Sequence, residues 1–179
     1  MRGNRDYPAV AAWLGAMSDR SAVQTVRSDD GTLVRLFSRV FGMSGGSAPT
    51  DESDAAFGGA AALEAGGKLI ANREAVLGDI LLHAGLGDQL TNTTARAVVD
   101  DALALVAHRL TTGGALDASS VTSHDESDAS AAAATASAAL SFLRARVSAP
   151  RDMSAAAAVQ LRAACAAEAV TAYDRFGYS

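Results

Sequence analysis

Cysteine, lysine, proline and aromatic residues are all scarce in this chain. Its 179 residues include one cysteine, Cys165, one lysine, Lys68, three prolines and only 5% aromatic side chains. A single cysteine excludes a disulfide within the chain, so the fold does not require an oxidising compartment. Because Cys165 lies among alanines in a helical pattern, we expect it to be a small buried side chain rather than a reactive thiol.

Long hydrophobic runs are also missing. No segment approaches the roughly 20 apolar residues that a helix needs to span a bilayer. The apolar run Ala9–Met17 is short, and the residues after it lack a convincing cleavage site for a secretory signal. We therefore expect a protein with no membrane association, located in the cytoplasm or in a virion.

The sequence contains none of the common catalytic or phosphate-binding motifs. There is no G-x-S-x-G, no H-E-x-x-H, no Walker loop and no dinucleotide-binding fingerprint. Four glycine pairs lack the Lys-Ser/Thr or strand context of a phosphate cradle: Gly45-Gly46, Gly58-Gly59, Gly66-Gly67 and Gly113-Gly114. The sequence thus predicts a protein that is not an enzyme and that holds no cofactor.

Three histidines leave one alternative open. Asp79 and His83 are four residues apart on a predicted helix and could share a metal ion, with His108 supplied by the following helix. The pair is equally well explained as a surface ion pair near a helix C-terminus. We predict no metal site, and a metal- or cofactor-binding helical protein is the third-ranked function.

Alanine takes the place of these missing residue types. It accounts for 42 of the 179 residues and is concentrated in the last third of the chain. Alanine is the best helix former, and its small side chain lets two helix backbones approach closely. Since the larger apolar residues recur at helical spacing, the sequence predicts an all-α, Ala-rich bundle of about five to seven helices with an N-terminal arm.

Capping residues and glycines predict where the helices begin and end. Short helices are expected from Asp6-Tyr7-Pro8, from a capping box at Ser21–Gln24, and from Thr32 to Gly42. The later helices are expected from Thr50 or Ser53, over Lys68–Ala84, Thr94–Leu110 and Asp128–Val147, and from Asp152 or Ser154 to about Tyr173. For the helix over Thr94–Leu110, caps are expected from Thr91-Asn92-Thr93 and a stop at Gly113-Gly114. The Gly-, Ser- and Pro-containing segment 43–50 is the clearest break. It separates an N-terminal helical arm or subdomain (1–42) from the main bundle (51–179).

Charge is distributed unevenly along the chain. The net charge is −5, but residues 1–42 carry six arginines and four aspartates, +2 in total, which leaves −7 for the rest. Such asymmetry can mark a contact between subunits or a nucleic-acid face, and the alternative, favoured over nucleic acid, is an ordinary solvated helix face. Arg35 and Arg39, four residues apart, are the candidate phosphate contacts, although the negative total argues against avid non-specific binding.

The scarcity of large apolar side chains suggests how the protein functions. Ala-rich helices bury little area each, so neighbouring copies would add the area that one chain lacks. The leading expectation is a self-assembling structural subunit of a filament, capsid or shell, whose partners are other copies of itself and nucleic acid. The alternative is a helical interaction module or inhibitor with a partner-binding groove. The candidate interface anchors are Trp13, Phe37, Phe41, Tyr173, Phe176 and Tyr178.

Overall fold

The computed structural model describes residues 7–28, 32–33, 57–87, 90–116 and 126–176. These ranges contain seven helices and no strand, so the predicted all-α fold is confirmed. The helices are α1 (Pro8–Ser18), α2 (Ser21–Val26), α4 (Ala60–Ala71), α5 (Arg73–His83), α6 (Asn92–Thr112), α7 (Glu126–Arg146) and α8 (Ala155–Phe176). Segment 43–50 and most of the helix expected after Thr32 lie outside the described residues.

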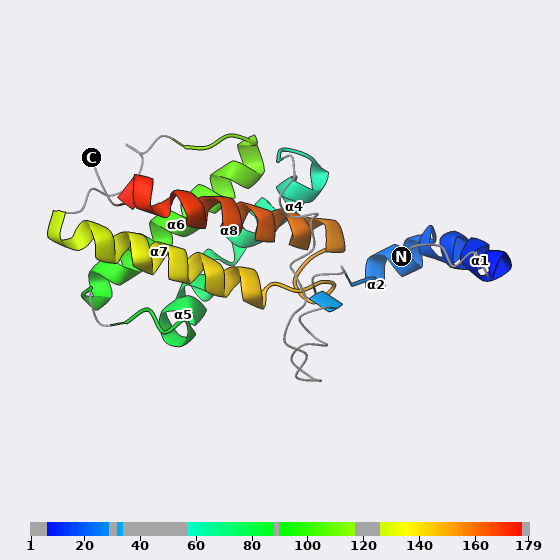
Figure 1. Ribbon diagram of the computed structural model, residues 1–179, viewed down its shortest axis with the longest axis horizontal. Helices are drawn as coiled ribbons and strands as arrows, with labels where there is room; N and C mark the ends of the chain where they lie inside the picture. The colour runs from blue at the N-terminus through cyan, green and yellow to red at the C-terminus, as the bar shows by residue number, and fades with distance from the viewer. Residues whose placement is uncertain (1–6, 29–31, 34–56, 88–89, 117–125, 177–179) are drawn as a thin grey trace.

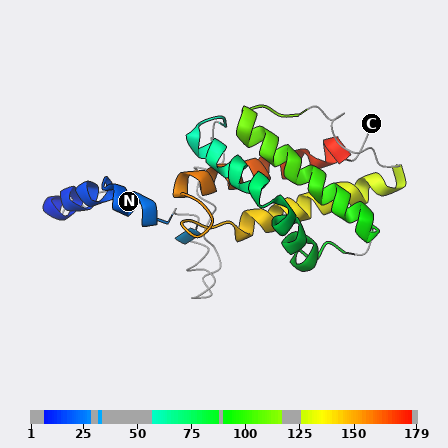
Figure 2. The same ribbon diagram turned by 180° about the vertical axis from the view of Figure 1, so that it is seen from behind.

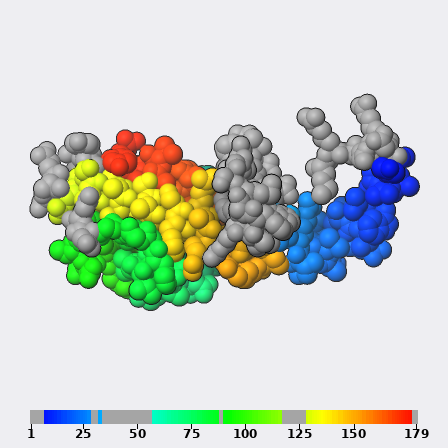
Figure 3. All heavy atoms as spheres, turned by 60° about the horizontal axis from the view of Figure 1, so that its bottom comes forward, coloured from blue at the N-terminus to red at the C-terminus, as the bar shows by residue number. Residues whose placement is uncertain are grey.

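Helices α4 to α8 form the bundle, and α1 and α2 lie outside it. Figures 1 and 2 show α7 and α8 side by side, with α6 beside them. Helix α4 packs against α6 and α8, and α5 packs against α6 and α7. The buried core is drawn from these five helices and their connections, and it contains no residue of α1 or α2. We call residues 7–28 the arm; in Figure 3 it extends beyond one end of the bundle.

Alanine supplies many of the buried positions of α7 and α8, which pack against each other. The buried alanines include Ala132, Ala133, Ala136 and Ala139 of α7 and Ala157, Ala158, Ala164 and Ala172 of α8. Small side chains let the two helices approach closely, which restores dispersion contacts that each alanine alone could not make. The expectation that these helices need neighbouring copies to bury their surface is therefore wrong. As predicted, Cys165 is one of the buried side chains of α8.

The single helix that the sequence predicted over Lys68–Ala84 is interrupted at Asn72. Asn72 has φ −111° and ψ 12°, and its side-chain amide donates to the carbonyl oxygen of Lys68 at 2.8 Å. A side chain bonded in this way competes with the helical hydrogen bonds, so α4 ends and α5 begins there. Helix α4 instead starts at Ala60 and continues through Gly66 and Gly67, at the point where it meets α6.

Gly66 is required by the contact between α4 and α6. A Cβ atom at this position would lie 2.8 Å from Cγ2 of Thr111 and 3.3 Å from Cβ of Leu110. Thr111 has little freedom to move away, because its hydroxyl donates to the carbonyl oxygens of Ala107 (2.9 Å) and His108 (3.1 Å). The neighbouring Gly67 is exposed, and a Cβ atom at this position would have no atom of another segment within 4 Å.

Three of the predicted helix caps are confirmed. The Thr91 hydroxyl accepts a hydrogen bond from the N–H of Thr94 at 3.2 Å at the start of α6. Gly113 ends α6 with a left-handed φ of 77°, which glycine adopts without strain. The Ser154 hydroxyl accepts from the N–H of Ala157 at 3.2 Å at the start of α8.

The capping box expected at Ser21–Gln24 is not formed. Arg20 occupies the N-cap position of α2 and makes no side-chain capping bond. The Gln24 amide donates instead to the carbonyl oxygen of Ser18, at the end of α1. This bond joins the two short helices of the arm, which explains why the reciprocal capping bond is lost.

A buried carboxylate joins α6 to α8. Glu168 of α8 is 2% exposed, and its Oε1 accepts from Nε of Arg109 at 2.5 Å. Its Oε2 lies 3.3 Å from Nε of Arg175, whose Nη1 donates to the carbonyl oxygen of Leu116 at 2.6 Å. The guanidinium of Arg109 also lies over the Phe57 ring, 5.5 Å from its centroid. Two cations satisfy one buried anion, as a buried charge requires.

Residues 147–154, between α7 and α8, form a tight loop that we call the arm-root loop. It contains a cis peptide bond at Ala149-Pro150. The Asp152 carboxylate accepts from the N–H of Ser148 at 2.9 Å, and Arg151 donates both to Asp152 and to the carbonyl oxygen of Arg146 at 2.8 Å. Burial opposes ionisation of Asp152, but hydrogen bonds from Arg151 and Ser148 outweigh it and lower the pKa of this carboxyl.

The end of the arm is anchored on this loop. The Ser28 hydroxyl donates to the carbonyl oxygen of Ala149 at 2.9 Å, and the N–H of Ala149 donates to the Thr32 hydroxyl at 3.2 Å. Two bonds to one residue fix the point at which the arm leaves the bundle. Helices α1 and α2 lie beyond that point (Figure 1).

The two adjacent glycines of α4 should respond to alanine in opposite directions. Gly67→Ala should stabilise the protein by up to ~1 kcal/mol, because alanine has the higher helix propensity. Gly66→Ala gains the same propensity but meets Thr111, and overpacking typically costs ~1–3 kcal/mol, so we expect net destabilisation. Urea unfolding of both variants measures the difference. Equal stabilisation by both substitutions would show that the close contact with α6 is absent.

The lowered pKa of Asp152 predicts how stability changes with pH. A folded-state pKa below the unfolded one means that the ionised carboxylate stabilises the fold above the unfolded pKa of about 4. That contribution is lost as the pH falls through the folded pKa. Asp152→Asn should therefore lower stability at neutral pH, and the difference from wild type should shrink in acid. Urea titrations at several pH values measure this, with the exposed Asp174→Asn as the matched control.

Candidate functional site

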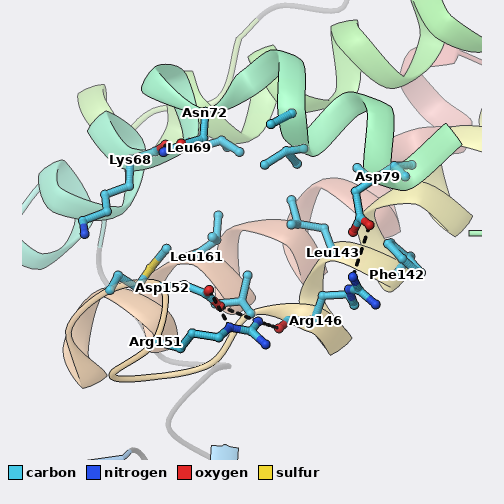
Figure 4. A pocket seen from close by; sticks show the side chains of 15 residues that line it. Lys68, Leu69, Asn72, Asp79, Phe142, Leu143, Arg146, Arg151, Asp152 and Leu161 are labelled. Carbon is cyan, nitrogen blue, oxygen red and sulfur yellow. Dashed lines mark hydrogen bonds and ion pairs between the residues drawn. The ribbon is translucent and has the colours of Figure 1, made fainter. Parts of the chain in front are cut away.

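A groove lies between α5 and the C-terminal end of α7 (Figure 4). Its volume is about 410 Å³, within the range of pockets that hold ligands or side chains of a partner. Helix α4 contributes to one wall and the arm-root loop to another. The lining residues are Lys68, Leu69, Asn72, Ala75, Val76, Asp79, Ile80, Phe142, Leu143, Arg146, Val147, Arg151, Asp152, Met153 and Leu161.

The floor of the groove is aliphatic. Ile80 of α5, Leu143 of α7 and Leu161 of α8 are buried members of the bundle core that also line it. Val76 and Phe142 are partly exposed and extend the same apolar surface toward solvent. A surface built from these residues favours an apolar occupant.

The charges at the rim are largely paired with one another. Arg146 donates to Asp79 at 3.1 Å, and its guanidinium lies 5.3 Å from the centroid of the Phe142 ring. Arg151 donates through Nε and Nη2 to Asp152, at 2.8 Å in each case. In Figure 4 the Asp79–Arg146 pair spans from α5 to α7, the Arg151–Asp152 pair lies on the arm-root loop beside it, and Lys68 lies at the other end of the groove. Paired rim charges leave the floor open without an uncompensated charge beside it.

The histidine alternative is not supported by the geometry. Nδ1 of His83 lies 3.0 Å from Oδ1 of Asp79, and the same carboxylate binds Arg146. This is the surface pair that the four-residue spacing equally well predicted. In the described part of the chain, no three His, Cys, Asp or Glu side chains converge, so His108 does not complete a metal site with them.

Helix α1 presents the second surface. Its large side chains Val10, Trp13, Leu14 and Met17 occupy positions i, i+3, i+4 and i+7, the spacing of a helix that docks into a groove. Trp13 is 60% exposed, and no residue of α1 is buried by the described part of the chain. The eleven residues carry no charge. The sequence predicted Trp13 to be in a core or an interface, and it lies in no core within the described ranges.

The other predicted anchors have different positions. Tyr173 is 53% exposed on α8, so it remains accessible to a partner. Phe176 is 5% exposed and packs in the core, so it is not available as a contact. Its burial follows from the helical spacing of Ala172 and Phe176, which places both on the inner face of α8. Phe37, Phe41, Tyr178, and the candidate phosphate contacts Arg35 and Arg39, lie outside the described residues.

Sequence reasoning missed the groove entirely. Its lining comes from four helices and a loop, and no two neighbouring lining residues form a motif. The pairing of Arg146 with Asp79 joins residues 67 positions apart. The nearest signal was Asp79 itself, which stood out for another reason, as a partner of His83. The apolar face of α1, in contrast, was visible from spacing alone.

Comparisons with known proteins add no functional information. The chain matches no protein-family model, and no curated protein or solved structure is significantly similar to it. None of the helices in the described ranges combines the length and apolar character needed to cross a bilayer. A functional hypothesis must therefore be argued from the arm and the groove.

Proposed function

We propose that this protein is a self-assembling structural subunit of a filament, capsid or shell, and that its arm binds another copy. The observation that carries the proposal is the position of α1. This uncharged helix presents Trp13 and its neighbouring apolar residues to solvent, on an arm that lies outside a bundle with a core of its own. An exposed apolar stripe is costly unless it is covered in the working state.

The bundle does not depend on the arm for its core. The described arm residues contribute nothing to the core cluster, whereas α4 to α8 bury an aliphatic and alanine interior among themselves. The arm is therefore free to contact a partner without opening the fold. In the described part of the chain, Ser28 of the arm and Thr32 beyond it hydrogen-bond to the bundle, both with Ala149.

The charge distribution favours another copy as the partner. Residues 1–42 have a net charge of +2 and the remaining residues a net charge of −7. Copies arranged head to tail would bring the positive segment of one chain near the negative bundle of the next, which speeds and orients association. Nucleic-acid binding through Arg35 and Arg39 belongs to the same proposal as a further role of the positive segment.

Trp13→Ala should weaken self-association without changing the fold. Removing one buried aromatic side chain from a contact costs about 2 kcal/mol, or roughly thirtyfold in the dissociation constant. Sedimentation velocity from micromolar to near-millimolar concentration measures the change. Leu82→Ala, at an exposed leucine of α5, is the matched control and should leave association unchanged.

The same measurement separates the proposal from its alternatives. Because Trp13 is the chain's single tryptophan, its emission should shift to shorter wavelength as concentration rises. A chain that stays monomeric at every concentration contradicts self-assembly and leaves an interaction module with a different partner. An ultraviolet absorbance spectrum of the purified assembly that shows no nucleic acid would contradict the role of Arg35 and Arg39.

A further inference from the structure

We infer that the groove between α5 and α7 receives helix α1 of a second copy of this chain. The inference rests on the proposed function, because it names the surface to which the arm binds. The groove offers Leu143, Ile80 and Leu161 as a floor, and α1 offers an uncharged, largely apolar helix whose large side chains fall on one face.

The charged residues at the rim of the groove are compatible with binding of an uncharged helix. Asp79 is paired with Arg146, and Asp152 with Arg151, so covering the floor with α1 separates no ion pair and buries no lone charge of the helix. Lys68 lies at the other end of the groove from Asp79 (Figure 4). A cation there complements the carbonyl end of α1, which has no basic residue in its last turn and is followed by Asp19.

The size of the groove matches the anchor residues of α1. A volume of about 410 Å³ accepts one large aromatic side chain together with a smaller neighbour, the pattern that Trp13 and Val10 present three positions apart on one face. Aromatic anchors in desolvated pockets dominate the energetics of helix-in-groove contacts. Trp13 is therefore the residue that we place on the groove floor.

The position of the arm root selects a second copy over the chain's own groove. Met153 and Asp152 of the arm-root loop line the groove, and Ala149 of the same loop holds Ser28 and Thr32. From this root the arm runs beyond the end of the bundle, on the opposite side of the loop from α5 (Figures 1 and 3). In this arrangement α1 reaches a neighbouring molecule, while the groove of its own chain stays open to another arm.

Two complementary variants of the full chain test the inference. Ala75→Glu places a carboxylate at an exposed lining position, in the first turn of α5 where an acidic residue suits the helix. Trp13→Ala removes the anchor and leaves the groove intact. Each variant alone should associate at least about tenfold more weakly than wild type. Ala134→Glu, at an exposed position of α7 that does not line the groove, is the charge-matched control and should associate as wild type does.

Mixing the two variants gives the decisive readout. In the mixture the Ala75→Glu copy carries the only Trp13 and the Trp13→Ala copy carries the only intact groove. Docking between copies should shift the tryptophan emission to shorter wavelength and produce a heavier species in sedimentation. Ala75→Gln serves as a second, neutral groove variant, and circular dichroism verifies that each variant retains its helices.

The outcomes distinguish the groove from the proposed function. If wild type assembles but Ala75→Glu assembles equally well, or the mixture shows no shift, the groove is not the acceptor and self-assembly stands. If the tryptophan of wild type is already shielded in a monomer, the arm occupies its own groove and the second copy is excluded. If wild type stays monomeric with an exposed tryptophan, both proposals fail.

Discussion

The close approach of α7 and α8 through their alanines is the constraint on which the rest of the structure depends. Ala133, Ala136, Ala158 and Ala164 are fully buried in these two helices, α6 packs against both of them, and α4 packs against α8. This packing closes a core without any residue of α1 or α2. Among the described residues, the arm therefore adds nothing to the core of its own chain.

The same constraint explains where polar chemistry is placed. Alanine surfaces offer no hydrogen bonds, so contacts between helices that need direction come from a few charged residues. Glu168 joins Arg109 to Arg175 inside the bundle, and the Arg146–Asp79 pair joins α7 to α5 at one end of the groove. These charged groups are satisfied by one another.

Local signals in the sequence predicted much of the fold, but they could not predict contacts between segments that are distant in the sequence. The Thr91 and Ser154 caps and the Gly113 stop depend on a few neighbouring residues, and they were predicted correctly. The break at Asn72 was missed because the apolar spacing continues across it. The conclusion that alanine-rich helices need other copies failed because their pairing within one chain is a tertiary property. The groove was invisible since its lining is assembled from segments up to 93 residues apart, from Lys68 to Leu161.

Energetics determine what kind of assembly one arm can support. Covering Val10, Trp13 and Leu14 contributes roughly 1.5–3 kcal/mol for each side chain, about 5–9 kcal/mol in all. Association alone costs an estimated 4–15 kcal/mol, so a single arm in a single groove gives a weak complex. Two arms exchanged between two copies, or arms linking each copy to two neighbours, double the contact while the cost for each added subunit stays the same. An arm of this size therefore favours reciprocal or repeated assembly, the arrangement that a structural subunit uses, over a single encounter with an unrelated partner.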